Sequence, residues 1–225
     1  MLNLIKNFLK SSAVIRKEKS EKILKKKGIP INKNLPVITD DAEDVKIRSK
    51  KEIAQRAIAL AIVAVKGEEV LKQDTLTELM DTFSARDFFT SEEKKFIENT
   101  NPPQQAKINF TWKYECYWVM LWVLGYIEKL DYPDHVGDVS KSAKILRDAG
   151  SYENLLKNSV LREPKEILDQ ADLIYRYHWA CVNARLNEED PPSELDSGVV
   201  VERHRALNWL VSYSDQDWDD VTTDT

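Results

Sequence analysis

Apolar residues recur along the chain at helical spacing, and Gly and Pro fall between these stretches rather than inside them. This spacing predicts helices whose apolar faces meet in a core. Ser49 and Glu52 form a capping box ahead of one stretch. Thr90 and Glu93 repeat the pattern, and Asp138 is a candidate N-cap. We therefore expect an all-α protein, a compact multi-helix single domain of about eight or nine helices.

Four stretches define the expected body of the protein. Residues 50–66 are apolar nearly all round, which predicts a central, buried helix. Residues 104–129 form the strongest hydrophobic element and are predicted as one helix. Pro164 is placed to begin a long helix that ends at residue 186. A last helix is expected near residues 198–212.

The chain divides into three segments by composition. Residues 1–27 are basic and amphipathic, with Leu2, Ile5, Phe8 and Leu9 on one helical face. Residues 28–48 contain two prolines followed by an acidic cluster, which predicts an extended N-terminal arm and the start of a short helix. Residues 49–225 are predicted as the main helical domain, ending in an acidic tail.

The formal net charge of −5 hides an uneven distribution. Residues 1–28 hold nine basic and two acidic side chains, a net charge of +7. A basic end can contact nucleic acid or anionic lipid. No aromatic residue interrupts the lysine run as a base-stacking platform, so we expect no specific nucleic-acid binding and interpret the lysines as a solvated helix face. Membrane contact through residues 1–27 is a weaker alternative.

Cysteine usage indicates a reducing compartment. Cys116 and Cys181 both lie in apolar helical patterns, and nothing resembles a disulfide framework. The apolar N-terminal stretch is broken by Asn and Lys, so it does not read as a secretory signal. The longest apolar run, residues 117–127, is well short of the ~20 residues that span a bilayer. These observations predict a cytoplasmic protein.

His178 and Cys181 are the most interesting candidates for chemistry. At a spacing of three they share a helical face, and both residue types bind Zn²⁺. His204 and Cys116, on other apolar stripes, are candidates to complete the ligand set. Because no dense motif such as C-x-x-C or H-E-x-x-H is present, we interpret them as core histidines and inert thiols, and expect neither a metal nor a cofactor.

A second set of polar residues is compatible with acid/base or phosphate chemistry. Two carboxylates three residues apart on a helix can act together in acid/base chemistry, and the guanidinium group of Arg suits phosphate binding. Ordinary surface ion pairs have the same appearance and are more frequent. The set comprises Asp169, Asp172, Arg176, Glu202, Arg203 and Arg205.

Two charged residues interrupt strongly apolar helices, Arg56 and Glu115. An unpaired buried charge is costly, so each must have a partner. We predict that the two pair with each other, or that each meets another buried polar group such as His178 or His204.

The acidic tail, residues 214–225, carries five aspartates around Trp218. It is either a docking element for a basic partner or a segment that folds back onto the N-terminal lysines. Trp218 favours burial and the two ends attract, so we predict folding back.

The C-terminal third contains a distinctive set of residues. They run from Asp169 through Tyr175, Arg176, His178, Trp179 and Cys181 to Ala184-Arg185-Leu186, then Glu202-Arg203-His204-Arg205, Trp209, and the ending Trp218-Asp219-Asp220-Val221. With these residues the chain resembles an uncharacterised bacterial family, domain of unknown function 4272. The resemblance covers nearly the whole chain from about Arg16, and it implies an intact single domain of a bacterial protein. It supplies no activity, substrate or cofactor, so no residue role is transferred.

Two functions from different classes follow. The leading expectation is a non-enzymatic helical interaction or regulatory protein that binds a protein partner, because no catalytic motif occurs. The alternative is a metal-assisted or acid/base hydrolase with its site between the helices 164–186 and 198–212. A solvent-reaching polar cleft with His178, Cys181 and His204 favours the enzyme; a sealed core there and an exposed apolar patch elsewhere favour the interaction protein.

Overall fold

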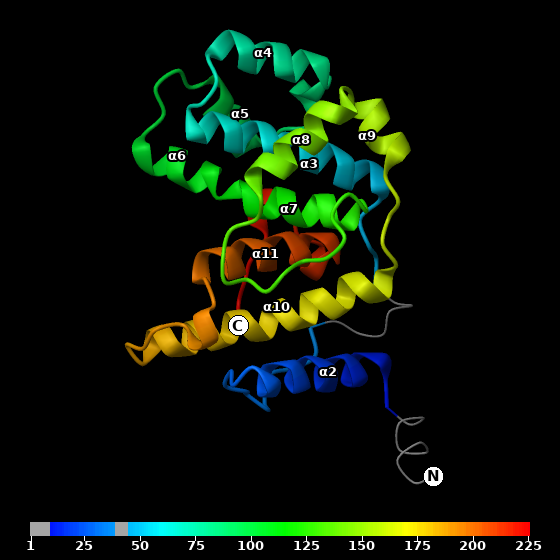
Figure 1. The fold of residues 1–225 in the computed structure, drawn as a ribbon, viewed down its shortest axis with the longest axis vertical. Coiled ribbons are helices and arrows are strands. Elements are labelled where there is room, and N and C mark those ends of the chain that lie inside the picture. Colours follow the sequence, from blue (N-terminus) through cyan, green and yellow to red (C-terminus); the bar gives the residue numbers. More distant parts are fainter. Residues whose placement is uncertain (1–9, 39–44) are drawn as a thin grey trace.

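Helix α3 (Lys50–Glu68) forms the centre of the upper part of the molecule (Figure 1). Its capping box forms as predicted, with Ser49 accepting from the Glu52 amide and Glu52 accepting from the Ser49 amide. Side chains on all sides of α3 are buried, which confirms the central position predicted for it. The computed structural model describes residues 10–38 and 45–225.

The strongest hydrophobic element is two helices rather than the single one predicted over residues 104–129. Helix α6 (Gln104–Thr111) ends at Trp112, and α7 (Lys113–Val123) begins there. The chain leaves α7 because Gly125 adopts φ +83°, a left-handed conformation that glycine takes without steric cost. Residues 124–129 are therefore loop, and the prediction of one long helix is wrong.

The lower part of the molecule is a stack of helices. Helix α11 (Ser197–Leu210) packs against α7, α10 (Pro164–Leu186) packs against α11, and α2 (Ser12–Lys26) packs against α10 (Figure 1). The predicted bounds of α10 are confirmed, with Pro164 at its first turn. An apolar core runs through these layers, from Leu24 to Trp118 and Val200.

Shorter helices surround α3. They are α4 (Gln73–Thr82), α5 (Ser91–Glu98), α8 (Val139–Ala149) and α9 (Tyr152–Asn158), with 3₁₀ turns at Ala85–Asp87, Pro192–Glu194, Tyr213–Asp215 and Trp218–Asp220. Thr90 caps α5 and Asp138 caps α8, as predicted. The described residues form helices and loops with no strand, which confirms the all-α, single-domain prediction.

After α2, residues 27–38 form an arm without helix or strand. Ile29 and Leu35 bury their side chains, and the ammonium of Lys17 binds the carbonyl of Lys33 at 2.9 Å. The amphipathic pattern of residues 2–9 and the acidic helix start at residues 40–44 lie outside the described residues. Across the described ranges, no helix is both long and apolar enough to cross a bilayer.

Candidate functional site

A long loop, residues 125–138, joins α7 to α8 and lies along α10 and α11. Loops of this length without secondary structure are uncommon in compact domains and often functional. The loop is held to the body by several hydrogen bonds: the Asp196 amide donates to the Pro133 carbonyl at 2.8 Å, and the Tyr132 hydroxyl donates to the Ser193 carbonyl at 2.7 Å. These hydrogen bonds fix the position of the loop against the rest of the protein.

A buried ion pair lies beneath this loop. Glu115 on α7 accepts from the Arg203 Nε on α11 at 3.0 Å, and both side chains are at most 4% exposed. The other carboxylate oxygen of Glu115 accepts from the Gly137 amide, and Arg203 Nη1 donates to the Asp131 carbonyl at 2.7 Å. One ion pair thus holds the loop at two points, Asp131 and Gly137.

On the α6 side, the loop forms a groove of about 320 Å³ with α3 and α6. Ile108 is 43% exposed and Val136 is 50% exposed, and both line this groove together with Trp112. A Cβ at Gly67, at its base, would lie 2.7 Å from the Lys107 carbonyl oxygen, so glycine permits the close approach of α3 and α6. Glu68 lines the groove and accepts a 2.8 Å hydrogen bond from the Tyr114 hydroxyl.

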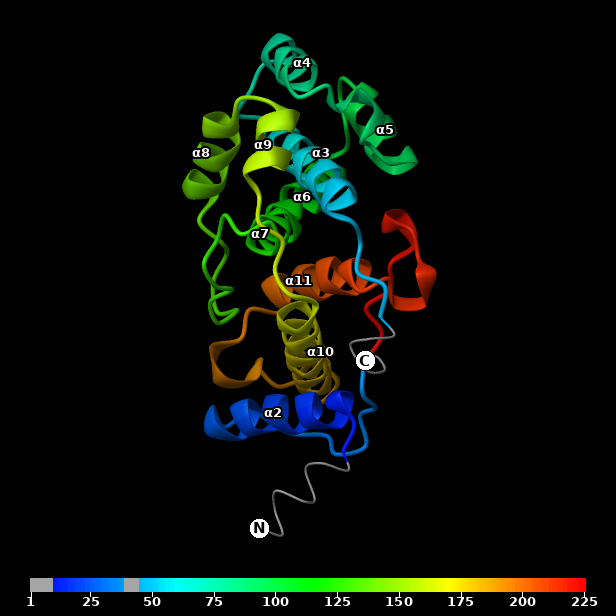
Figure 2. The same ribbon diagram turned by 90° about the vertical axis from the view of Figure 1, so that its right-hand side faces the viewer.

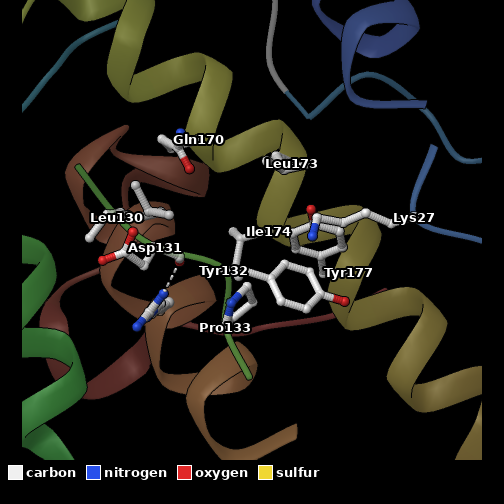
Figure 3. Close-up of a pocket in the computed structure, with 11 residues that line it drawn as sticks. Lys27, Leu130, Asp131, Tyr132, Pro133, Gln170, Leu173, Ile174 and Tyr177 are labelled. Atoms are coloured by element: carbon white, nitrogen blue, oxygen red, sulfur yellow. Dashed lines mark hydrogen bonds between the residues drawn. The ribbon is translucent and has the colours of Figure 1, made fainter. Parts of the chain in front are cut away.

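On the α10 side, the loop forms a cavity of about 160 Å³ (Figure 3). Lys27, Tyr132 and Tyr177 gather on one side of it, and Asp131 and Gln170 lie on the other. The Lys27 ammonium lies 3.6 Å from the centre of the Tyr132 ring. The Tyr132 and Tyr177 rings meet edge to face at 5.7 Å. The cavity combines aromatic walls with a cationic side chain.

The structure brings two of the predicted candidates together, His178 and His204. Their Nδ1 atoms are 2.9 Å apart, so one ring donates to the other. His204 is 1% exposed, and burial, followed by the neighbouring His178, lowers its pKa to about 3. Burial and, secondarily, the charge of Arg185 also lower the pKa of His178. Both rings are therefore neutral at pH 7. His204 is sealed in the interior, whereas His178 also borders an open cavity.

This pair makes stability depend on pH. The folded pKa of His204 lies below its unfolded value, so its contribution is complete above about pH 6.5 and is lost as pH falls toward 3. Wild-type protein should lose about 2 kcal/mol through this group between pH 7 and pH 4.5. Urea unfolding at both pH values should show a smaller loss for His204→Gln. His135→Gln, at a mostly exposed histidine, is the matched control and should behave as wild type. An unchanged pH dependence in His204→Gln would contradict this assignment.

The two cysteines do not join the histidine pair. Cys181 and His178 line an open cavity of about 520 Å³, but no described hydrogen bond connects them. Cys116 lies where α7 meets α11, with its sulfur 3.0 Å from Glu202 Oε2. Burial raises the pKa of both thiols, so both are protonated and weakly nucleophilic at neutral pH. Among the described residues, no three His, Cys, Asp or Glu side chains are placed to hold a metal ion.

Of the two alternatives predicted for Arg56 and Glu115, the pair between them does not form, and each residue meets another buried polar group instead. Arg56 faces α5 and pairs with Glu93, and its guanidinium lies 5.1 Å from the centre of the Trp218 ring. Glu115 faces α11 instead, and pairs with Arg203. Each buried charge does have a partner, but the partner is an oppositely charged side chain and not one of the histidines.

The remaining acid/base candidates are each engaged in structural contacts. Asp172 and Arg176 form a fully buried two-point ion pair at 2.7 and 2.9 Å within α10. Asp169 pairs with Lys19 at 2.5 Å, which ties α10 to α2. Glu202 pairs with Lys113 at 2.7 Å. No hydrogen bond within the described residues joins two of these carboxylates. Among the six candidates, Arg203 alone lines one of the two cavities beside the loop.

The acidic tail folds back, as predicted, although not onto the N-terminal lysines. Trp218 and Val221 are buried, and the Trp218 ring meets the Trp209 ring of α11 at 5.6 Å. Asn208 donates to the Thr222 carbonyl at 2.9 Å. Figure 2 shows the tail beside α11 and below α5. Burial of Trp218, rather than attraction between the two charged ends, therefore fixes its position.

A protein-family model described as domain of unknown function (DUF4272) matches residues 16–221, which confirms the resemblance. No curated protein matches. No solved structure matches.

Proposed function

We propose that this protein, which belongs to the DUF4272 family, is a non-enzymatic interaction module. Membership of the family assigns it no activity. Its binding surface is the groove between α3, α6 and the loop before α8. The observation that carries this proposal is that Ile108 and Val136, from distant parts of the chain, are both about half exposed in one groove. Scattered exposed apolar residues are ordinary, whereas grouped ones mark interaction sites.

The occupant of the groove is one large apolar side chain of a partner protein, with a basic residue next to it. A volume of about 320 Å³ suits a single anchor side chain, the usual centre of a protein interface. The groove also has an acidic side: Glu68 is exposed there and forms no ion pair among the described residues. The other acidic residue that lines the groove, Glu115, is neutralised by its ion pair with Arg203, so the negative charge that remains is that of Glu68. The remaining charge attracts a cation.

The test uses a random peptide library displayed on phage and selected against the intact protein. Selected peptides should contain Trp, Phe or Leu beside Lys or Arg. Ile108→Glu places a charge in the groove and should weaken binding of these peptides at least about tenfold. Val160→Glu alters an exposed apolar residue outside the groove, 74% exposed, and should bind as wild type. No enrichment above the blank, or equal binding by Ile108→Glu, would refute the proposal.

The hydrolase alternative between α10 and α11 has weaker support. The His178 ring is engaged by His204 and by the backbone of Thr223, and no described hydrogen bond directs it to Cys181. His204 is sealed from solvent. A general base must reach its proton donor, and this geometry offers no such contact.

We also propose a bacterial cytoplasm as the location, on the support of two free, buried thiols. Specific nucleic-acid binding and membrane contact through residues 1–27 are not part of the proposal. Several basic side chains of this region already form contacts within the protein. Lys10 pairs with Glu18, Lys17 binds the Lys33 carbonyl and Lys19 pairs with Asp169.

A further inference from the structure

The cavity between the loop and α10 contains a buried guanidinium with a free nitrogen. Arg203 is 3% exposed; its Nε binds Glu115 and its Nη1 binds the Asp131 carbonyl. Its remaining terminal nitrogen, Nη2, makes no hydrogen bond within the described residues, although Arg203 lines the cavity. This nitrogen is accessible from the cavity, because it is not among the fully buried side-chain atoms that lack a hydrogen-bond partner. A ligand atom that accepts a hydrogen bond is the expected partner.

Two of the three charged residues that line this cavity form ion pairs. Arg203 is neutralised by Glu115, and Asp131 pairs with Lys129 at 2.9 Å. Lys27 completes the set of charged lining residues, and it forms no ion pair within the part of the chain that the structure describes. Its ammonium instead lies against the Tyr132 ring, 3.6 Å from the centre. Asp134 lies near Lys27, whose charge contributes to lowering the pKa of the Asp134 carboxyl. No ion pair occupies the Lys27 ammonium within the described residues, so it is available to an anionic ligand.

The rest of the lining is apolar or aromatic. Leu173, Ile174 and Leu207 supply aliphatic surface, and Tyr132 and Tyr177 form a wall (Figure 3). Tyr177 is 3% exposed and its hydroxyl has no hydrogen bond within the described residues. The volume is about 160 Å³. An engineered cavity of about 150 Å³ in another protein accommodates benzene, which sets the size of the ligand body.

We propose that this cavity binds a small organic monocarboxylate with an aromatic or branched apolar body. The carboxylate lies between Arg203 and Lys27, and the body lies against Tyr132 and Tyr177. This site is separate from the groove and does not rest on the proposed protein-binding function.

The test measures binding of benzoate and 3-methylbutanoate to the full-length protein by amide chemical shifts. Benzoate or 3-methylbutanoate should shift resonances of residues 130–133 and 170–177 in a saturable way. Benzamide has the same shape as benzoate without its charge, and should bind at least about tenfold more weakly. Lys27→Gln removes the charge of the lining residue that forms no ion pair within the described residues, at an exposed position, and should weaken binding of the carboxylate at least about fivefold. Lys26→Gln, an equal change of net charge at the neighbouring residue outside the cavity, should bind as wild type.

Three results would overturn the proposal. The first is that neither carboxylate shifts these resonances at 20 mM, roughly the weakest affinity worth calling a site. The second is that benzamide binds as tightly as benzoate. The third is that Lys27→Gln and Lys26→Gln bind the carboxylate equally, which would show attraction to the general positive charge of α2 rather than to the cavity.

Discussion

Replacing Glu115 with alanine lowers the free energy of unfolding by about 3–5 kcal/mol, because it leaves the guanidinium of Arg203 buried without its counter-charge. The same change removes the acceptor of the Gly137 amide, so one end of the loop at residues 125–138 is released. Loss of the ion pair and loss of the loop contact act together. The effect should therefore exceed that of an ordinary surface substitution several-fold.

Urea unfolding at pH 7 measures this difference. Glu166→Ala is the matched control, since Glu166 also pairs with an arginine, Arg162 at 3.1 Å, but its side chain is 53% exposed. It should cost no more than about 1 kcal/mol. The double variant Glu115→Leu/Arg203→Met removes both charges and should be more stable than Glu115→Ala. If Glu115→Ala and Glu166→Ala unfold at the same urea concentration, the ion pair does not hold this part of the fold.

Replacing Trp218 with alanine costs about 3 kcal/mol or more, because its ring fills the space between Trp209 and Arg56. The cavity left behind also exposes the Arg56–Glu93 ion pair, both of whose side chains are at most 5% exposed. The tail thus covers a buried charge as well as an apolar surface.

Thermal unfolding and proteolysis of the tail together measure this effect. Asp217→Ala, at the exposed neighbouring residue, should leave the melting temperature and the protease sensitivity of the tail unchanged. Trp218→Ala should lower the melting temperature and make residues 212–225 sensitive to protease. A Trp218→Ala protein with the melting temperature of Asp217→Ala would show that the tail lies on the surface without stabilising it.

Local signals in the sequence predicted much of the fold. The capping residues Ser49, Thr90 and Asp138 and the first-turn Pro164 act within a few residues of themselves, so their helix starts were predictable. The end of α7 was missed because the apolar pattern continues past Gly125 into the loop. Periodicity reports which residues are buried, but not where a backbone with apolar side chains stops being helical.

The sites were less predictable, because they depend on contacts between distant segments. Arg56 and Glu115 were identified as buried charges from their apolar surroundings, yet their partners, Glu93 and Arg203, follow from how helices face one another. The neighbouring positions of His178 and His204 followed from two apolar stripes that meet. The groove was not predicted: Val136 belongs to a loop whose position depends on the Glu115–Arg203 pair.

The most direct test of the protein-binding proposal is the effect of Glu68→Lys on peptide affinity, measured by isothermal titration calorimetry. A selected peptide with an apolar anchor beside Arg, and the same peptide with Glu in place of that Arg, are titrated against both proteins. The proposal predicts that wild type prefers the Arg peptide and that Glu68→Lys reverses the preference. Equal preference in the two proteins would contradict the groove as the binding surface.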